Sequence, residues 1–183
     1  MDVLTRVALI ANNPAITDIP EADVYYHFNS AIHWGKTPDL LSAIVVRMAH
    51  TVRTAHSFRC YPNAVKAGCV LSCGWQNEIQ QFRERNPNHG AADHIYIDVP
   101  EYPEGKSPTT GWAVLQRMLL IKDVDITCVG FDLKSASYYK ASKLHALDWE
   151  IEQFRILVES GRIKAHQSSV ASVLTESLEV PSV

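Results

Sequence analysis

Short apolar runs alternate along the chain with stretches that have helical spacing. The runs predict strands at residues 3–11, 24–28, 43–46, 68–72, 95–99 and 126–130. Apolar side chains recur at steps of three and four, which predicts helices, at residues 75–85, 111–121 and 144–161. Strands alternating with helices predict an α/β fold: a doubly wound, mainly parallel, Rossmann-like sheet with helices on both faces.

Length and composition narrow the class of protein. A chain of 183 residues with 46% hydrophobic and 20% charged residues suits one globular α/β domain spanning residues 1–183. The tail, residues 167–183, is rich in Ser, Val and Glu, and is expected to be irregular or to add one short element. The net charge of -3 argues against a nucleic-acid partner, and no apolar run approaches the roughly 20 residues that span a bilayer.

The N-terminus and the cysteines indicate a cytoplasmic protein. "MDVLTRVALIANNP" lacks the basic start, long apolar stretch and cleavage site of a signal peptide. The four cysteines have no zinc-like spacing, and Cys69 and Cys128 fall in predicted strands, so we expect reduced, structural thiols. The sequence leaves a homo-oligomer open.

Small polar side chains follow the predicted strands. In an open parallel sheet, ligands bind beyond the carboxyl ends of the strands. Asn12 follows the first strand, Asn29 the second, and Tyr138, Tyr139 and His145 come after the sixth. Each has an ordinary alternative role as a turn, a cap or a packed ring.

The stretch "SPTTGW" predicts a helix start. With Thr109 or Thr110 as the N-cap and Gly111 allowing close approach, the first backbone N–H groups would bind a carboxylate or phosphate. An ordinary threonine cap is the alternative. Neither a Walker loop nor a GxGxxG fingerprint is present in the sequence.

The stretch "KLHALDWE" places His145 five residues before Glu150. Five residues correspond to about 140° around a helix, so His145 and Glu150 would not share a face if both were helical. His145 is therefore expected at or before the helix cap, with Glu150 as structural support bonding back to the entering backbone. Whether His145 is a base or a packed cap stays open at this point.

Asp123 and Asp125 form an Asp-x-Asp pair, a spacing that holds metal ions in many glycosyltransferases. Here the pair precedes the sixth predicted strand, which puts it at the amino end of the sheet. A turn explains it equally well, and we expect no metal site there.

The order of these motifs resembles the sialyltransferase fold. The motifs are the Asn-x-Pro loop, "DVYYHFN", "SPTTGWAVLQRMLL", "VDITCVGFD", the tyrosine pair and His-x4-Glu, across residues 3–165. The chain also resembles a short bacterial group described as urease operon accessory proteins, in which a Gly-Arg pair followed by Ile or Leu comes after the last helix, like Gly161-Arg162-Ile163 here.

The resemblance implies a metal-independent inverting glycosyltransferase that uses a CMP-activated sugar and no other cofactor. His145 would be the catalytic base and Glu150 structural support. The nucleotide sugar would contact Asn12, Asn29, Thr109, Thr110, Gly111, Tyr138 and Tyr139. The alternative is a non-catalytic nucleotide- or partner-binding accessory protein. It is favoured by Ala11 and Asn13, which replace glycines of the family's first loop.

Overall fold

The computed structural model describes residues 4–47, 69–85, 93–99, 101–131 and 145–166, together with Asn63 and Ala67. Its strands form one seven-stranded sheet in the order β5-β4-β3-β2-β1-β6-β7. They are β1 (Thr5–Ile10), β2 (Val24–Phe28), β3 (Ser42–Arg47), β4 (Val70–Gly74), β5 (Asp93–Tyr96), β6 (Val124–Val129) and β7 (Lys164–His166). All these pairings are parallel. The predicted α/β, Rossmann-like sheet is confirmed, and the carboxyl ends of its strands lie at one edge.

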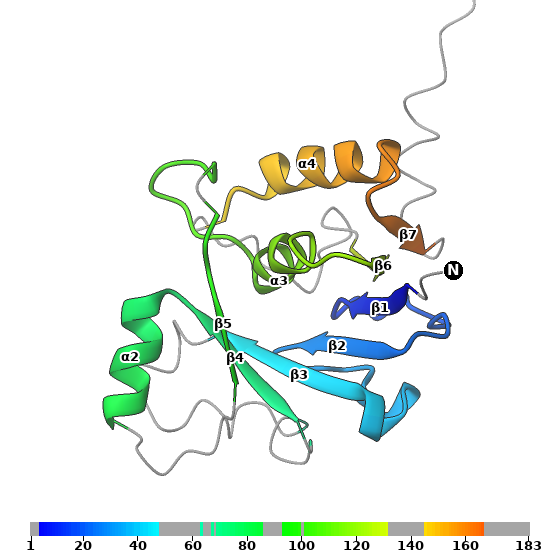
Figure 1. The fold of residues 1–183 in the computed structure, drawn as a ribbon, viewed down its shortest axis with the longest axis horizontal. Coiled ribbons are helices and arrows are strands. Elements are labelled where there is room, and N and C mark those ends of the chain that lie inside the picture. Colours follow the sequence, from blue (N-terminus) through cyan, green and yellow to red (C-terminus); the bar gives the residue numbers. More distant parts are fainter. Residues whose placement is uncertain are drawn as a thin grey trace, which may run out of the picture.

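Helices cover both faces of the sheet. They are α2 (Gln76–Arg85), α3 (Thr110–Met118) and α4 (Leu147–Glu159), with short 3-10 turns η1 (Trp34–Lys36) and η2 (Asp39–Leu41). Helices α3 and α4 lie together on one side of the strands (Figure 1), and their apolar faces share the larger core. On the other face, Ile79 of α2 and Trp34 of η1 pack against Ile44 and Val46 of β3. No helix among the described residues is long and apolar enough to cross a bilayer.

Strands β4 and β5 are shifted along the chain from their predicted positions, and β7 was not predicted. Strand β4 begins two residues later than expected, so Cys69 is exposed before the strand and Cys73 is buried in it. Strand β5 is shifted toward the N-terminus; Ile97 still donates its N–H to Gly74 O at 3.0 Å before the chain leaves the sheet. Strand β7 was missed because its three residues contain no apolar run.

Gly130 ends β6 in a left-handed conformation, with φ of +70°. An added Cβ would lie 2.4 Å from Ile16 Cδ1 and 2.7 Å from Ile16 Cγ1. Because strain and overpacking combine, we expect Gly130→Ala to lower the free energy of unfolding by about 2–3 kcal/mol. Gly105 has the same φ and no atom within 4 Å of such a Cβ. Gly105→Ala should therefore show the strain alone, and equal losses in urea unfolding would contradict the packing argument.

His27 of β2 is a buried neutral histidine, and its burial makes the stability of the protein depend on pH. Its Nε2 lies 2.8 Å from Thr37 Oγ1, and its Nδ1 is buried without a partner. Burial lowers the pKa of His27 to about 4. The unfolded chain therefore takes up this proton near pH 6.5 while the folded protein does not, so stability falls between about pH 6.5 and pH 4, by roughly 3 kcal/mol at most. His27→Gln should flatten that part of the unfolding-versus-pH curve; identical slopes in both proteins would contradict the assignment.

Candidate functional site

Hydrogen bonds join the loop that follows β1 to the end of β2 and the segment after it. Asn12 Nδ2 donates to Phe28 O at 2.7 Å, and Asn12 Oδ1 accepts from Ile32 N at 3.2 Å. Beside it, His33 Nε2 lies 2.7 Å from Asn13 O and must donate, because a carbonyl oxygen only accepts. The amide expected to touch a nucleotide thus already holds the loop in place.

Asn29 links β2, β3 and α3 at the same edge. It has a left-handed φ of 47°, which an asparagine tolerates better than most residues. Its Oδ1 accepts from Arg47 N at 3.0 Å, and its Nδ2 lies 3.4 Å from Thr110 Oγ1. Two residues predicted for the site, Asn29 and Thr110, are therefore neighbours.

Thr109 is the N-cap of α3, and a carboxylate from α4 occupies its donors. Thr109 Oγ1 accepts from Trp112 N at 3.1 Å. Thr109 N donates to Glu150 Oε1 at 2.8 Å, and Thr109 Oγ1 donates to Glu150 Oε2 at 2.8 Å. The carboxylate that this cap binds is therefore the protein's own, and Glu150 is only 1% exposed.

Tyr102 connects Glu150 to the start of α4. Its hydroxyl donates to Glu150 Oε1 at 2.7 Å and accepts from Ala146 N at 3.0 Å. Glu150 was expected to bond directly to the entering backbone; instead, the link runs through the tyrosine. Burial raises the pKa of Glu150, and the hydrogen bonds from Thr109 and Tyr102 oppose that rise. All three donors favour the ionised carboxylate.

His145 lies immediately before Ala146, the N-cap of α4, as the helical period predicted. Its Nδ1 is 2.5 Å from Ser107 O, in the loop that leads into α3. Because this carbonyl oxygen only accepts, Nδ1 carries the proton, and in the neutral ring Nε2 carries the lone pair. The side chain is therefore oriented and in the tautomer that can accept a proton at Nε2.

Arg47 and Tyr102 belong to the same edge and were not predicted. Arg47 ends β3 and donates to Ser107 Oγ at 2.8 Å. The one feature of the sequence that indicated Arg47 is its position as a charged residue at the end of the run "SAIVVR". Tyr102 lies in a Pro-rich loop, where nothing local indicates a buried hydroxyl relay.

Gly111, the tyrosine pair and the Asp-x-Asp pair are the remaining positions for which the sequence made a prediction. An added Cβ on Gly111 would lie 2.9 Å from a Phe131 ring atom. In this structure the aromatic ring therefore lies next to Gly111, where a ligand was expected to approach. Tyr138 and Tyr139 lie outside the described residues. Asp125 forms an ion pair with Lys164 at 2.5 Å at the start of β6, which is the amino end of this strand. The described residues contain no cluster of three or more His, Cys, Asp or Glu side chains that could hold a metal.

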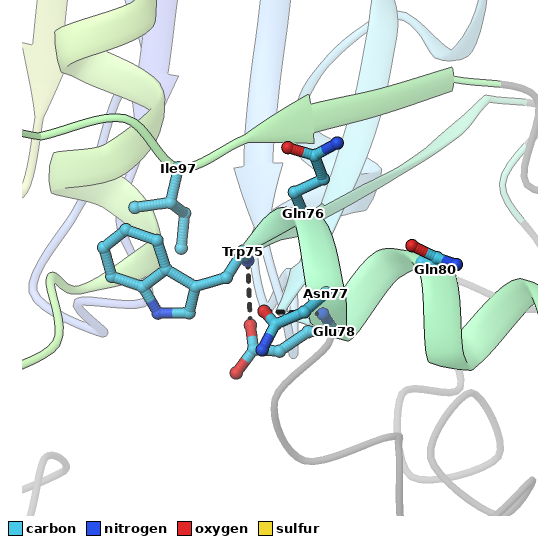
Figure 2. A pocket seen from close by; sticks show the side chains of 6 residues that line it. All are labelled: Trp75, Gln76, Asn77, Glu78, Gln80 and Ile97. Atoms are coloured by element: carbon cyan, nitrogen blue, oxygen red, sulfur yellow. Dashed lines mark hydrogen bonds between the residues drawn. The ribbon is translucent and has the colours of Figure 1, made fainter.

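An open cavity of about 650 Å³ lies at the carboxyl ends of β4 and β5. Figure 2 shows its lining: the indole of Trp75 beside Ile97, with polar side chains from the first turns of α2. Glu78 Oε2 accepts from Trp75 N at 2.9 Å and so caps α2. Neither His145 nor Arg47 lines this cavity, so it is a feature separate from the predicted site.

Comparison with known proteins identifies the fold. Over 88% of this chain and 75% of the other, the structure is similar to the crystal structure of an α-2,3-sialyltransferase from Campylobacter jejuni in its apo form, with a TM-score of 0.57. This chain has a sialyltransferase-like fold. The sequence identity is 13%, so the similarity concerns the fold alone. No model of a known protein family matches the chain, and no curated protein matches it, so the relation to urease accessory proteins stays a prediction.

Proposed function

We propose that the protein transfers a sugar from a CMP-activated donor to an acceptor hydroxyl, by a metal-independent inverting reaction at the carboxyl edge of the sheet. The observation that carries this proposal is the contact between His145 Nδ1 and Ser107 O, which puts the proton of the neutral ring on Nδ1 and makes Nε2 its basic nitrogen. It occurs in a sialyltransferase-like fold, at the edge where open parallel sheets bind ligands.

In this reaction, His145 Nε2 takes the proton of the acceptor hydroxyl. The acceptor oxygen forms a bond to the anomeric carbon of the sugar, and the bond from that carbon to the CMP phosphate oxygen breaks on the opposite face. CMP leaves with the electron pair of the broken bond, and the configuration at the anomeric carbon inverts. General-base assistance of this kind commonly contributes about 10²–10⁴-fold to the rate.

The remaining ligand contacts are assigned to polar groups around this base. In the described part of the chain, the amides of Thr110 and Gly111 make no hydrogen bond, so they are the donors that the start of α3 offers a substrate carboxylate or phosphate. The nucleotide side and its phosphate are assigned to Asn12, Asn29, Tyr138 and Tyr139.

A second function, binding of a nucleotide or partner without turnover, is favoured by one observation. The Asn12 amide and the Thr109 donors, both assigned to the ligand from the sequence, already bond within the chain. The two functions differ in one result, because a binding protein retains affinity for CMP but releases no CMP from a CMP-activated sugar.

Release of CMP from CMP-activated sugars, in the presence of excess EDTA and a panel of acceptor sugars, tests the proposal. We expect release that requires an acceptor and is unaffected by EDTA. Binding of CMP without release under any acceptor would favour the second function. Absence of both would reject the nucleotide assignment altogether.

Metal independence makes a separate prediction for Asp123 and Asp125. Replacing both with Asn should leave CMP affinity and release unchanged, because they lie at the amino end of the sheet; Asp123 O accepts from Thr5 N at 2.9 Å, where β1 begins. The lost ion pair with Lys164 is expected to cost stability by no more than about 1 kcal/mol. Manganese-dependent binding that disappears in the double variant would put the site at the other end.

A further inference from the structure

Arg47 is a buried cation at the carboxyl edge of the sheet. It ends β3 and is 7% exposed. Its guanidinium donates to two neutral acceptors, Ser107 Oγ at 2.8 Å and Pro108 O at 3.5 Å. Within the described residues, no Asp or Glu side chain forms an ion pair with it. A buried charge without a counter-ion is unfavourable, and no contact of Arg47 with another described residue neutralises its charge.

The charge lies beside the proposed base and acts on its surroundings. Ser107, which accepts from the guanidinium through its hydroxyl, also holds His145 through its carbonyl oxygen. Burial raises the pKa of the Cys73 thiol to about 11, and the positive charge of Arg47 opposes that rise. Burial and the hydrogen bond to Glu150 raise the pKa of Tyr102, and the Ala146 amide and, to a smaller extent, the charge of Arg47 oppose that rise.

The start of α3 explains why a positive charge would be useful at this edge of the sheet. The sequence predicted that the cap of α3 binds an acidic group of the ligand, but Glu150 occupies the donors of Thr109. An incoming anion at this edge would therefore meet the negative charge of Glu150 at the cap of α3 and the positive charge of Arg47, which ends β3 and contacts Ser107 in the loop before α3. A guanidinium matches the planar geometry of carboxylate and phosphate oxygens, and such charge-assisted bonds are stronger than neutral ones.

We infer that Arg47 is the counter-charge for an anionic oxygen group of the ligand, either a phosphate or a carboxylate, which binds next to Ser107 and His145. The identity of the full ligand rests on the proposed function, but the anion site does not. Arg47 thereby selects acidic ligands over neutral ones of the same shape.

Unfolding of the protein in inorganic phosphate, at ionic strength held constant with chloride, tests the anion site without a nucleotide. We expect phosphate to raise the melting temperature of the wild type and of Arg117→Gln, and to leave Arg47→Gln unaffected. Arg117 is an exposed residue in the last turn of α3, so this control removes the same charge away from the carboxyl edge. An equal response of Arg47→Gln and wild type would overturn the inference.

Paired ligands distinguish the two sources of the anion. Calorimetric titrations would compare CMP with cytidine, and N-acetylneuraminic acid with its methyl ester. We expect Arg47→Gln to lower the affinity for either CMP or N-acetylneuraminic acid about tenfold or more. The affinity for the matching ligand without the anionic group, cytidine or the methyl ester, should be unchanged. Arg47→Lys keeps the positive charge and serves as the second variant if Arg47→Gln does not fold. It should lower the affinity for the same charged ligand by less than Arg47→Gln does. Equal losses for charged and neutral members would make Arg47 a structural residue and overturn the inference.

The inference and the proposed function fail separately. Phosphate stabilisation that depends on Arg47, in a protein that binds no CMP, would support the anion site and reject the nucleotide. CMP binding that is indifferent to Arg47→Gln would support the nucleotide and reject the anion site.

Discussion

Replacing His145 with alanine is expected to lower the rate of CMP release by about 10²–10⁴-fold, because it removes the proton acceptor at Nε2. It also removes the hydrogen bond to Ser107 O, which should lower the free energy of unfolding by about 1 kcal/mol. Steady-state release assays and urea unfolding on the same preparations measure the two effects.

A matched variant separates catalysis from packing at this position. The amide of an asparagine places an N–H donor close to where His145 Nδ1 lies, but offers no nitrogen in place of Nε2. His145→Asn should therefore be nearly as stable as the wild type and as slow as His145→Ala. If His145 were only a packed cap, the stability of the two variants would follow the same order, but no transfer would be found in the wild type or in either variant. A folded His145→Ala protein with undiminished turnover would defeat the mechanism.

Replacing Glu150 with alanine is expected to be the most destabilising of these changes, by about 3–5 kcal/mol. The substitution removes a buried carboxylate and leaves Thr109 N, Thr109 Oγ1 and the Tyr102 hydroxyl without their acceptor. It also uncouples the start of α4 from the cap of α3, since Tyr102 holds Ala146 N. Chemical denaturation of the purified variants measures the loss.

Glu150→Gln should lose much less, about 0.5–2 kcal/mol. Its side-chain oxygen can stay at the Oε1 position, where two donors converge, while its Nε2 amide group at the Oε2 position can donate to Thr109 Oγ1. Glu152→Ala is the control on the same helix, because Glu152 is exposed and pairs only with Arg155 among the described residues. It should change stability by less than about 0.5 kcal/mol. Similar losses for Glu150→Ala and Glu152→Ala would show that Glu150 is not the link between the helices.

Local pattern was sufficient for much of the fold. The run that forms β2 was predicted with its observed bounds, because polar residues mark both ends and four of its five residues are strand formers. The period of the helix placed His145 before the cap of α4. Strand β7 could not be predicted, because three residues without alternation become a strand only by pairing with β6.

The contacts of the site depend on residues that are far apart in the chain. Glu150 and Thr109 are 41 positions apart, so no local spacing indicated that a side chain of α4 would fill the cap of α3. The same holds for Arg47 and Ser107, which are 60 positions apart. The sequence indicated the edge of the sheet and its polar residues. Tertiary packing decides which of these polar groups hydrogen-bond to one another.

Calorimetric titration of the wild-type protein with CMP, UDP and ATP tests the central claim most directly. The account predicts that CMP binds in the absence of a metal ion, that UDP and ATP do not, and that His145→Asn binds CMP as the wild type does. Failure to bind CMP, or equal binding of all three nucleotides, would contradict the claim that this edge of the sheet is a site for a CMP-activated sugar.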